Sequence, residues 1–212
     1  MIYRTVYTPE SDKLWPGIME KLEAYIHKSI WYDVNNAAPD APLDPEPNRQ
    51  VCALLKNVIM NSKDEFDGAT IPDIQKHFAK FADIADYLQG GSKSDGALYC
   101  SSEEIGNDPM VNDKVCLLVD QDVLEAVRDA PDPSPKAWDK SLYVKAVDGC
   151  YDPPYDPDLD ENHPRYSGWA FVNAFELWDL YEQASVEWDL GSLISSDDRA
   201  YNADTDVFRW HG

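Results

Sequence analysis

The sequence has few basic residues and no long apolar segment. Its 212 residues include 18 Lys and Arg against 40 Asp and Glu, a formal net charge of −22. Proteins that bind nucleic acids neutralise phosphates with Lys and Arg, so this balance excludes ordinary direct nucleic-acid binding. No apolar run approaches the ~18 residues that a membrane span requires, and the first residues lack the pattern of a signal peptide. We therefore expect an intracellular, cytoplasmic protein.

Cysteine is also scarce, and its spacing matches no common metal-binding motif. The four cysteines, Cys52, Cys100, Cys116 and Cys150, include no CxxC pair, which excludes the usual structural zinc sites. Cys52 and Cys116 lie in apolar runs and are predicted to be small core residues. Cys100 and Cys150 lie in loop-like segments. Disulfides are rare in the cytosol, and the sequence leaves open whether these two residues pair.

Familiar catalytic motifs are absent as well. The chain has no HExxH motif, no glycine-rich phosphate loop ahead of a helix, and no spacing typical of a Ser-His-Asp or Cys-His pair. These absences argue against a zinc hydrolase or a nucleophilic hydrolase. The sequence gives no indication of a bound cofactor.

What the sequence does have is a globular composition with strand and helix patterns in alternation. Hydrophobic residues make up 43% of it and aromatic residues 12%. Apolar periodicity predicts strands at residues 2–8, 114–120, 141–147, 169–172 and 207–210, and helices at 11–30, 70–88, 120–130 and 175–183. Residues 51–59 fit either a helix or a buried strand. This order predicts an α/β (α+β) fold in which helices pack against one mixed sheet, with residues 1–212 forming a single domain.

Three loop insertions are predicted within that domain, around residues 33–50, 90–113 and 148–167. The first carries four prolines and four acidic residues between Asp33 and Asn48, a composition typical of loops. Helix boundaries are suggested by capping residues. Ser11 is the predicted N-cap of the first helix, which places Pro16 near its first turn, and Asp120 or Asp122 caps the helix at 120–130.

Several segments carry a resemblance to a known family. They are the opening Tyr3-Arg4-Thr5 strand with its Trp-containing helix, the strand and helix LLVDQDVLEAV at 117–127 followed by YVKAV at 143–147, and the stretch from FVNAFELWDLYEQ to the final VFRW. Together they resemble a family of small α/β domains of unknown function found mainly in bacterial and fungal proteins. The resemblance implies the same fold class. It implies no activity, because none is established for that family.

Asp120 and Asp122 are the first candidate functional pair. They follow the apolar run KVCLLVD, and the carboxyl ends of strands are where open α/β sheets bind ligands. Two carboxylates there are weak candidates for holding Mg²⁺, and their spacing is similar to the nucleophile motif of haloacid-dehalogenase-type phosphatases. The simpler interpretation is that one carboxylate caps the helix and the other favours its N-terminal dipole.

An acidic loop gives a second candidate. Asp156, Asp158 and Asp160 alternate as in the first half of a Ca²⁺-binding loop. However, Glu161 stands where an EF-hand needs glycine, and Ser167 where it needs a bidentate glutamate. We therefore predict a solvated acidic loop and assign no metal to it.

Aromatic residues crowd the same region, and acidic charge is concentrated there. From Asp148 to Gly212 the chain has 15 acidic residues and 3 basic ones. Exposed aromatics among acids suit a surface that binds a basic protein. The binding residues predicted on this basis are Tyr155, Asp156, Asp158, Asp160, Tyr166, Trp169 and Trp178.

Two functions follow from these patterns. The favoured hypothesis is a non-enzymatic interaction module that binds a basic protein partner. The alternative is a small-molecule-binding protein or enzyme, with an aromatic-lined pocket and the Asp120/Asp122 pair as acid, base or metal ligand. The sequence does not decide whether the protein is an enzyme.

Overall fold

The computed structural model describes residues 1–88, 114–133, 142–149, 151, 166–186, 190–196, 201–202 and 207–210. Its centre is a seven-stranded mixed sheet in the order β2-β1-β3-β4-β5-β7-β6. The strands are β1 (Ile2–Arg4), β2 (Ile59–Met60), β3 (Val115–Val119), β4 (Tyr143–Asp148), β5 (Trp169–Asn173), β6 (Tyr201–Asn202) and β7 (Val207–Trp210). β1 runs parallel to β2 and β3, β4 runs antiparallel to β3 and β5, and β7 is parallel to β5 and antiparallel to β6.

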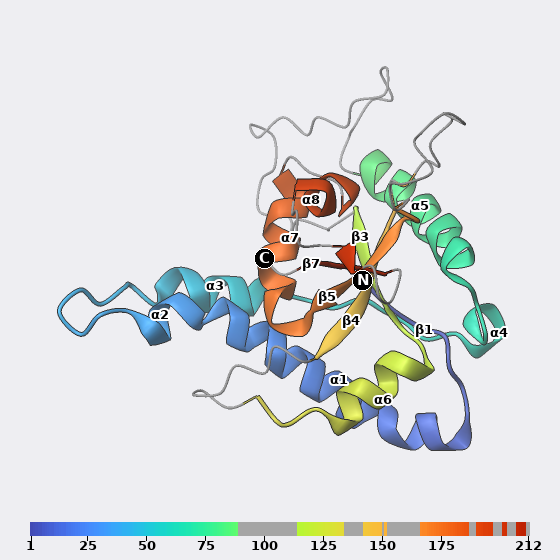
Figure 1. Ribbon diagram of the computed structural model, residues 1–212, viewed down its shortest axis with the longest axis horizontal. Helices are drawn as coiled ribbons and strands as arrows, with labels where there is room; N and C mark the ends of the chain where they lie inside the picture. Colours follow the sequence, from blue (N-terminus) through green and yellow to red (C-terminus); the bar gives the residue numbers. More distant parts are fainter. Residues whose placement is uncertain are drawn as a thin grey trace.

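Helices cover both faces of the sheet, which confirms the predicted α/β (α+β) class. They are α1 (Pro9–Ile30), α2 (Tyr32–Asn36), α3 (Glu46–Leu54), α4 (Lys63–Phe66), α5 (Ile71–Leu88), α6 (Gln121–Asp129), the 3-10 helix η1 (Ala174–Glu176), α7 (Leu177–Val186) and α8 (Leu190–Ser196). In Figure 1, α4 and α5 lie on one side of the strands, and α1, α6 and α7 lie together on the other. Within the described residues, no helix has the length and apolarity needed to span a membrane.

β3 shows why the core has two halves. All five of its residues are buried, and successive side chains point to opposite faces. Val115, Leu117 and Val119 join the larger cluster, under α1, α6, α7 and α8. Cys116 and Leu118 join the smaller one, under α4 and α5. The predicted burial of β3 on both faces is therefore confirmed.

The prediction of a core residue is confirmed for Cys116, whereas Cys52 packs against the outside of the larger cluster. Cys116 is fully buried and Cys52 is half-buried. Burial raises the pKa of the Cys116 thiol to about 12, so this thiol stays protonated and unreactive at neutral pH. Cys100 and Cys150 lie outside the described residues.

α1 begins one turn earlier than the sequence predicts. Thr8, and not Ser11, is the N-cap: Thr8 Oγ1 accepts from the Ser11 N–H at 3.0 Å, while Ser11 Oγ accepts from the Thr8 N–H at 2.8 Å. This reciprocal capping box places Pro9 at the first helical position, where its missing N–H is not needed. Pro16 therefore lies inside the helix, beyond its first turn.

Other boundaries also differ from the predicted ones. The opening strand ends at Arg4 instead of residue 8, and the predicted loop at 33–50 contains α2 and the start of α3. Residues 51–59, predicted as either a helix or a strand, contain part of each: α3 ends at Leu54 and β2 begins at Ile59. α5, α6, β4, β5 and β7 lie close to their predicted positions. The predicted loop at 90–113 and most of the one at 148–167 lie outside the described residues; Asp148, where the latter was expected to begin, is the last residue of β4.

Gly168 enters β5 in a conformation that side chains disfavour. Its φ is +81°, and a Cβ there would approach the Tyr151 ring within 2.5 Å. Its carbonyl oxygen accepts from Gln75 Nε2 at 3.0 Å and from the Asp148 N–H at 2.9 Å. Gly168 thus joins β4, β5 and α5.

Gly168→Ala is expected to lower the free energy of unfolding by about 2–4 kcal/mol, because it combines a left-handed backbone with a steric clash. Gly68 also has a positive φ, +71°, but open space around it, so Gly68→Ala should cost only about 1–2 kcal/mol. Urea denaturation measures both. Equal costs at the two positions would contradict the role of Gly168 in packing.

Candidate functional site

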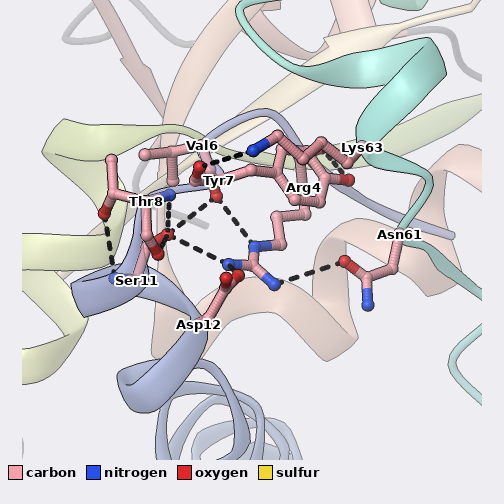
Figure 2. A network of polar contacts seen from close by, with 8 residues as sticks. All are labelled: Arg4, Val6, Tyr7, Thr8, Ser11, Asp12, Asn61 and Lys63. Carbon is pink, nitrogen blue, oxygen red and sulfur yellow. Dashed lines mark hydrogen bonds and ion pairs between the residues drawn. The ribbon is translucent and has the colours of Figure 1, made fainter.

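A buried arginine fixes the start of α1 (Figure 2). Arg4, at the end of β1, is 4% exposed. Its Nε donates to the Val6 carbonyl oxygen at 2.8 Å and its Nη2 to Ser11 Oγ at 3.0 Å. Nη2 also forms an ion pair with Asp12, and Nη1 donates to Asn61 Oδ1 at 3.4 Å. One side chain therefore connects β1, the first turn of α1 and the segment that follows β2.

Two aromatic rings enclose the same guanidinium. Its central carbon lies 4.5 Å from the Tyr7 ring centroid and 4.9 Å from that of Trp15, distances typical of cation–π contacts. The Tyr7 hydroxyl donates to the Arg4 carbonyl oxygen at 3.0 Å. Burial raises the pKa of Tyr7, so the hydroxyl keeps its proton at neutral pH and remains a donor.

This network lies where open α/β sheets often bind ligands. β1 and β3 are parallel neighbours, and Arg4 at the end of β1 is paired with Val119 at the end of β3, so the network lies beside the carboxyl ends of these two strands. The guanidinium N–H groups of Arg4 donate to acceptors of the protein itself, on Val6, Ser11 and Asn61. We therefore interpret Arg4 as a residue that positions α1.

The groove between α1 and α6 is the candidate binding surface. Its volume is about 620 Å³. α6 lies alongside the first half of α1 (Figure 1). The apolar lining residues are Leu14, Gly17, Ile18, Ala24 and Pro133, and the charged ones are Glu20, Lys21, Arg128 and Asp132.

Lys21 and Tyr25 hold the two sides of the groove together. Lys21 Nζ donates to the carbonyl oxygens of Arg128 at 3.2 Å and Ala130 at 2.5 Å. A cation in this position satisfies carbonyl groups at the C-terminal end of α6 and complements the helix dipole. The Tyr25 hydroxyl donates to the Pro131 carbonyl oxygen at 2.9 Å. The end of α6 is therefore fixed against α1.

Carboxylates outnumber basic groups around the groove. Asp132 lies 3.8 Å from Lys21 Nζ, and Asp129 binds the Arg128 guanidinium through two contacts, at 2.7 and 2.8 Å. Hydrogen bonding to Asp129 raises the pKa of Arg128, and Glu125 and Glu10 raise it further. The groove lining holds two carboxylates, Glu20 and Asp132, and two cations, Lys21 and Arg128, and the three further carboxylates Glu10, Glu125 and Asp129 act on Arg128.

The Asp120/Asp122 pair converges on a buried lysine. Asp120, one of the two predicted capping residues, is the N-cap of α6, and its Oδ1 accepts from the Val123 N–H at 3.1 Å. Its Oδ2 forms an ion pair with Lys145 Nζ, which lies 3.4 Å from Asp122 Oδ2. Both oxygens of Asp120 are thus engaged. In the part of the chain that the structure describes, no three His, Cys, Asp or Glu side chains are grouped to hold a metal ion.

Lys145 is the residue that sequence reasoning missed here. It is 8% exposed, and its Nζ lies 5.8 Å from the Trp169 ring centroid and 5.7 Å from that of Phe171. The structure thus brings Trp169 close to Asp120 through Lys145. A single lysine inside the apolar strand YVKAV was the signal, because a charge buried in a strand needs a partner.

The other predicted aromatic residues contribute to packing. Tyr166 and Trp178 are half-buried against the larger core cluster. The Tyr166 hydroxyl donates to Asp148 Oδ2 at 3.2 Å, and its ring stacks edge-on with Tyr151 at 5.7 Å. Trp169 packs partly against the smaller cluster. The remaining predicted binding residues, Tyr155, Asp156, Asp158 and Asp160, lie outside the described residues.

Comparisons with protein-family models, with curated proteins and with solved structures give no match to the chain. The resemblance to a family of small α/β domains therefore stays a prediction. Functional inference rests on the geometry of the molecule itself.

The ion pair at Lys145 predicts unequal roles for the two aspartates. Asp120→Ala should lower the free energy of unfolding by about 2 kcal/mol, because it removes an N-cap and leaves a buried lysine short of its nearest partner. The Asp122 side chain is 82% exposed, so Asp122→Ala should change it by less than about 0.5 kcal/mol. Urea denaturation of both variants gives the comparison. If neither variant loses stability but both lose Mg²⁺ binding in calorimetry, the structural interpretation is wrong.

The Arg4 network predicts that lysine cannot replace arginine. Arg4→Lys should cost about 2–3 kcal/mol of unfolding free energy, because an ammonium group lacks the planar fork that reaches Val6, Ser11 and Asn61 together. Asp12→Ala should cost less than about 1 kcal/mol, since that side chain is 61% exposed. Thermal and urea melts test this order. A larger loss of unfolding free energy in Asp12→Ala than in Arg4→Lys would mean that the ion pair with Asp12, and not the set of guanidinium hydrogen bonds, fixes α1.

Proposed function

We propose that the protein is a non-enzymatic interaction module that binds a basic segment of a partner protein in the groove between α1 and α6. The observation that carries the proposal is an apolar floor lined by Glu20 and Asp132, with three further carboxylates acting on Arg128 at its border. Such a surface matches a partner segment with an apolar side chain flanked by Lys or Arg.

The floor of the groove has room for an apolar side chain. Ile18 is buried beneath it, and Leu14 and Ala24 are half-exposed along the same side of α1. Gly17 contributes no side chain, and a Cβ built on it meets no atom within 4 Å. Burial of apolar surface against this floor supplies affinity, at roughly 25 cal/mol per Å² before the costs of association.

The acidic charge favours basic partners and raises the rate at which they associate. Glu20 and Asp132 line the groove itself, where each is placed to meet a Lys or Arg of the bound segment. The net charge of −22 extends the attraction beyond the contact surface and raises the association rate of a basic partner at low salt. The acidic loop predicted at Asp156, Asp158 and Asp160 adds to this long-range attraction.

A small-molecule site at Asp120 is less well supported. A general acid, base or metal ligand needs an available oxygen, whereas both oxygens of Asp120 are engaged, one by the α6 cap and one by Lys145. Charge reversal at Glu20 and Asp132 therefore tests the better-supported site.

The test uses a synthetic Lys/Leu amphipathic helical peptide as the probe, with binding followed by fluorescence anisotropy. Glu20→Lys/Asp132→Lys should weaken binding by about tenfold or more, because two favourable contacts become repulsive. Asp64→Lys/Asp73→Lys is the matched control: it changes the net charge equally, on α4 and α5, and should weaken binding by only about twofold.

A third variant tests the floor. Gly17→Leu fills the groove without changing charge and should also weaken binding of the peptide. If the two double variants lose affinity equally and Gly17→Leu loses none, the peptide responds only to the overall field, and the groove is not the binding site.

A further inference from the structure

β2 leaves an open edge on the sheet. It is the terminal strand beside β1. The Ile2 N–H donates to the Val58 carbonyl oxygen at 2.9 Å, and Ile2 is paired in parallel register with Ile59. In this register the peptide groups of Val58 and Met60 face β1, and the N–H and C=O of Ile59 face away. Within the described residues, neither group of Ile59 forms a hydrogen bond.

Apolar side chains are exposed beside that edge. Leu54 is 62% exposed and Val58 is 47% exposed. Leu55, Ile59 and Met60 are half-buried next to them. An unpaired strand edge flanked by exposed apolar residues is a template for another strand.

The charge of this segment is opposite to that of the molecule. No acidic residue occurs between Glu46 and Asp64, whereas Arg49, Lys56 and Lys63 fall within that stretch. Arg49 is paired with Glu46 at 3.2 Å; Lys56 and Lys63 are exposed. Two molecules that each carry −22 repel one another, and the repulsion is weakest where neither presents carboxylates.

We infer that this edge is a self-association surface, at which the β2 strands of two copies pair antiparallel across a twofold axis. Ile59 of each copy then exchanges both backbone hydrogen bonds with Ile59 of the other. Val58 of each copy then lies opposite Met60 of the other, and the two sheets become continuous. Such a contact is isologous and closed, which is the commonest symmetry of soluble oligomers.

This inference is independent of the proposed function, because it uses neither α6 nor the groove. The two also respond oppositely to salt. Screening weakens the attraction between the groove and a basic segment, and it relieves the repulsion between two acidic copies. Dimerisation should therefore strengthen between about 0.05 M and about 0.5 M NaCl, while peptide binding weakens.

Sedimentation velocity of the purified full chain over a concentration series tests the inference. The unmodified protein should shift from monomer to dimer as concentration rises, and Leu54→Asp/Val58→Asp should weaken the dimer by about tenfold or more, because it replaces the exposed apolar residues beside the paired strands with carboxylates of like charge on both copies. The control is Leu43→Asp: Leu43 is 51% exposed and lies between α2 and α3, away from β2, so this change should leave the dimer intact.

Amide hydrogen exchange at Ile59 supplies a readout that does not depend on a variant. Among the described residues the Ile59 amide has no hydrogen-bond partner, so its exchange should slow as the dimer forms. A monomer at every concentration and salt would overturn the inference and show that the short strand and Lys56 block the edge. A dimer that keeps fast exchange at Ile59, or that survives Leu54→Asp/Val58→Asp, would place the contact elsewhere.

Discussion

The rest of the molecule depends on the hydrogen bonds of the buried Arg4 guanidinium. A guanidinium at the end of the first strand cannot be left without partners, and this one is satisfied by the first turn of α1, by Asn61 beyond β2 and by two aromatic rings. It therefore fixes where α1 starts and how it crosses the sheet. The position of α1 sets one wall of the groove, and Lys21 on the same helix fixes the end of α6 that forms the other.

Much of the fold follows from the sequence, because its signals are local. Five consecutive apolar residues identified β3, and Asp120 after them identified the start of α6. The start of α1 was misplaced because Thr8 and Ser11 are both good capping residues, and only their reciprocal bonds show which one is the N-cap. At residues 51–59 the sequence left helix and strand open, because so short an apolar run carries no clear periodicity; pairing with β1 makes Ile59 and Met60 a strand.

The candidate site was less predictable than the fold. The sequence directed attention to acids and aromatics near the C-terminal end, and Tyr166 and Trp178 pack against the core there. The groove joins Leu14, Gly17 and Ile18 to Arg128 and Asp132, residues more than a hundred positions apart. Their proximity depends on how α1 and α6 pack. The net charge, in contrast, was readable at once, and it favours the same class of partner that we propose for the groove.

The most direct measurement is a backbone chemical-shift titration of the protein with the Lys/Leu amphipathic peptide. If the groove binds basic segments, the largest shifts should fall on α1 around Leu14, Gly17 and Lys21 and on the chain from Arg128 to Pro133, and they should saturate at one peptide per protein. Shifts spread over all acidic surfaces without saturation, or centred on β5 around Trp169, would contradict the account.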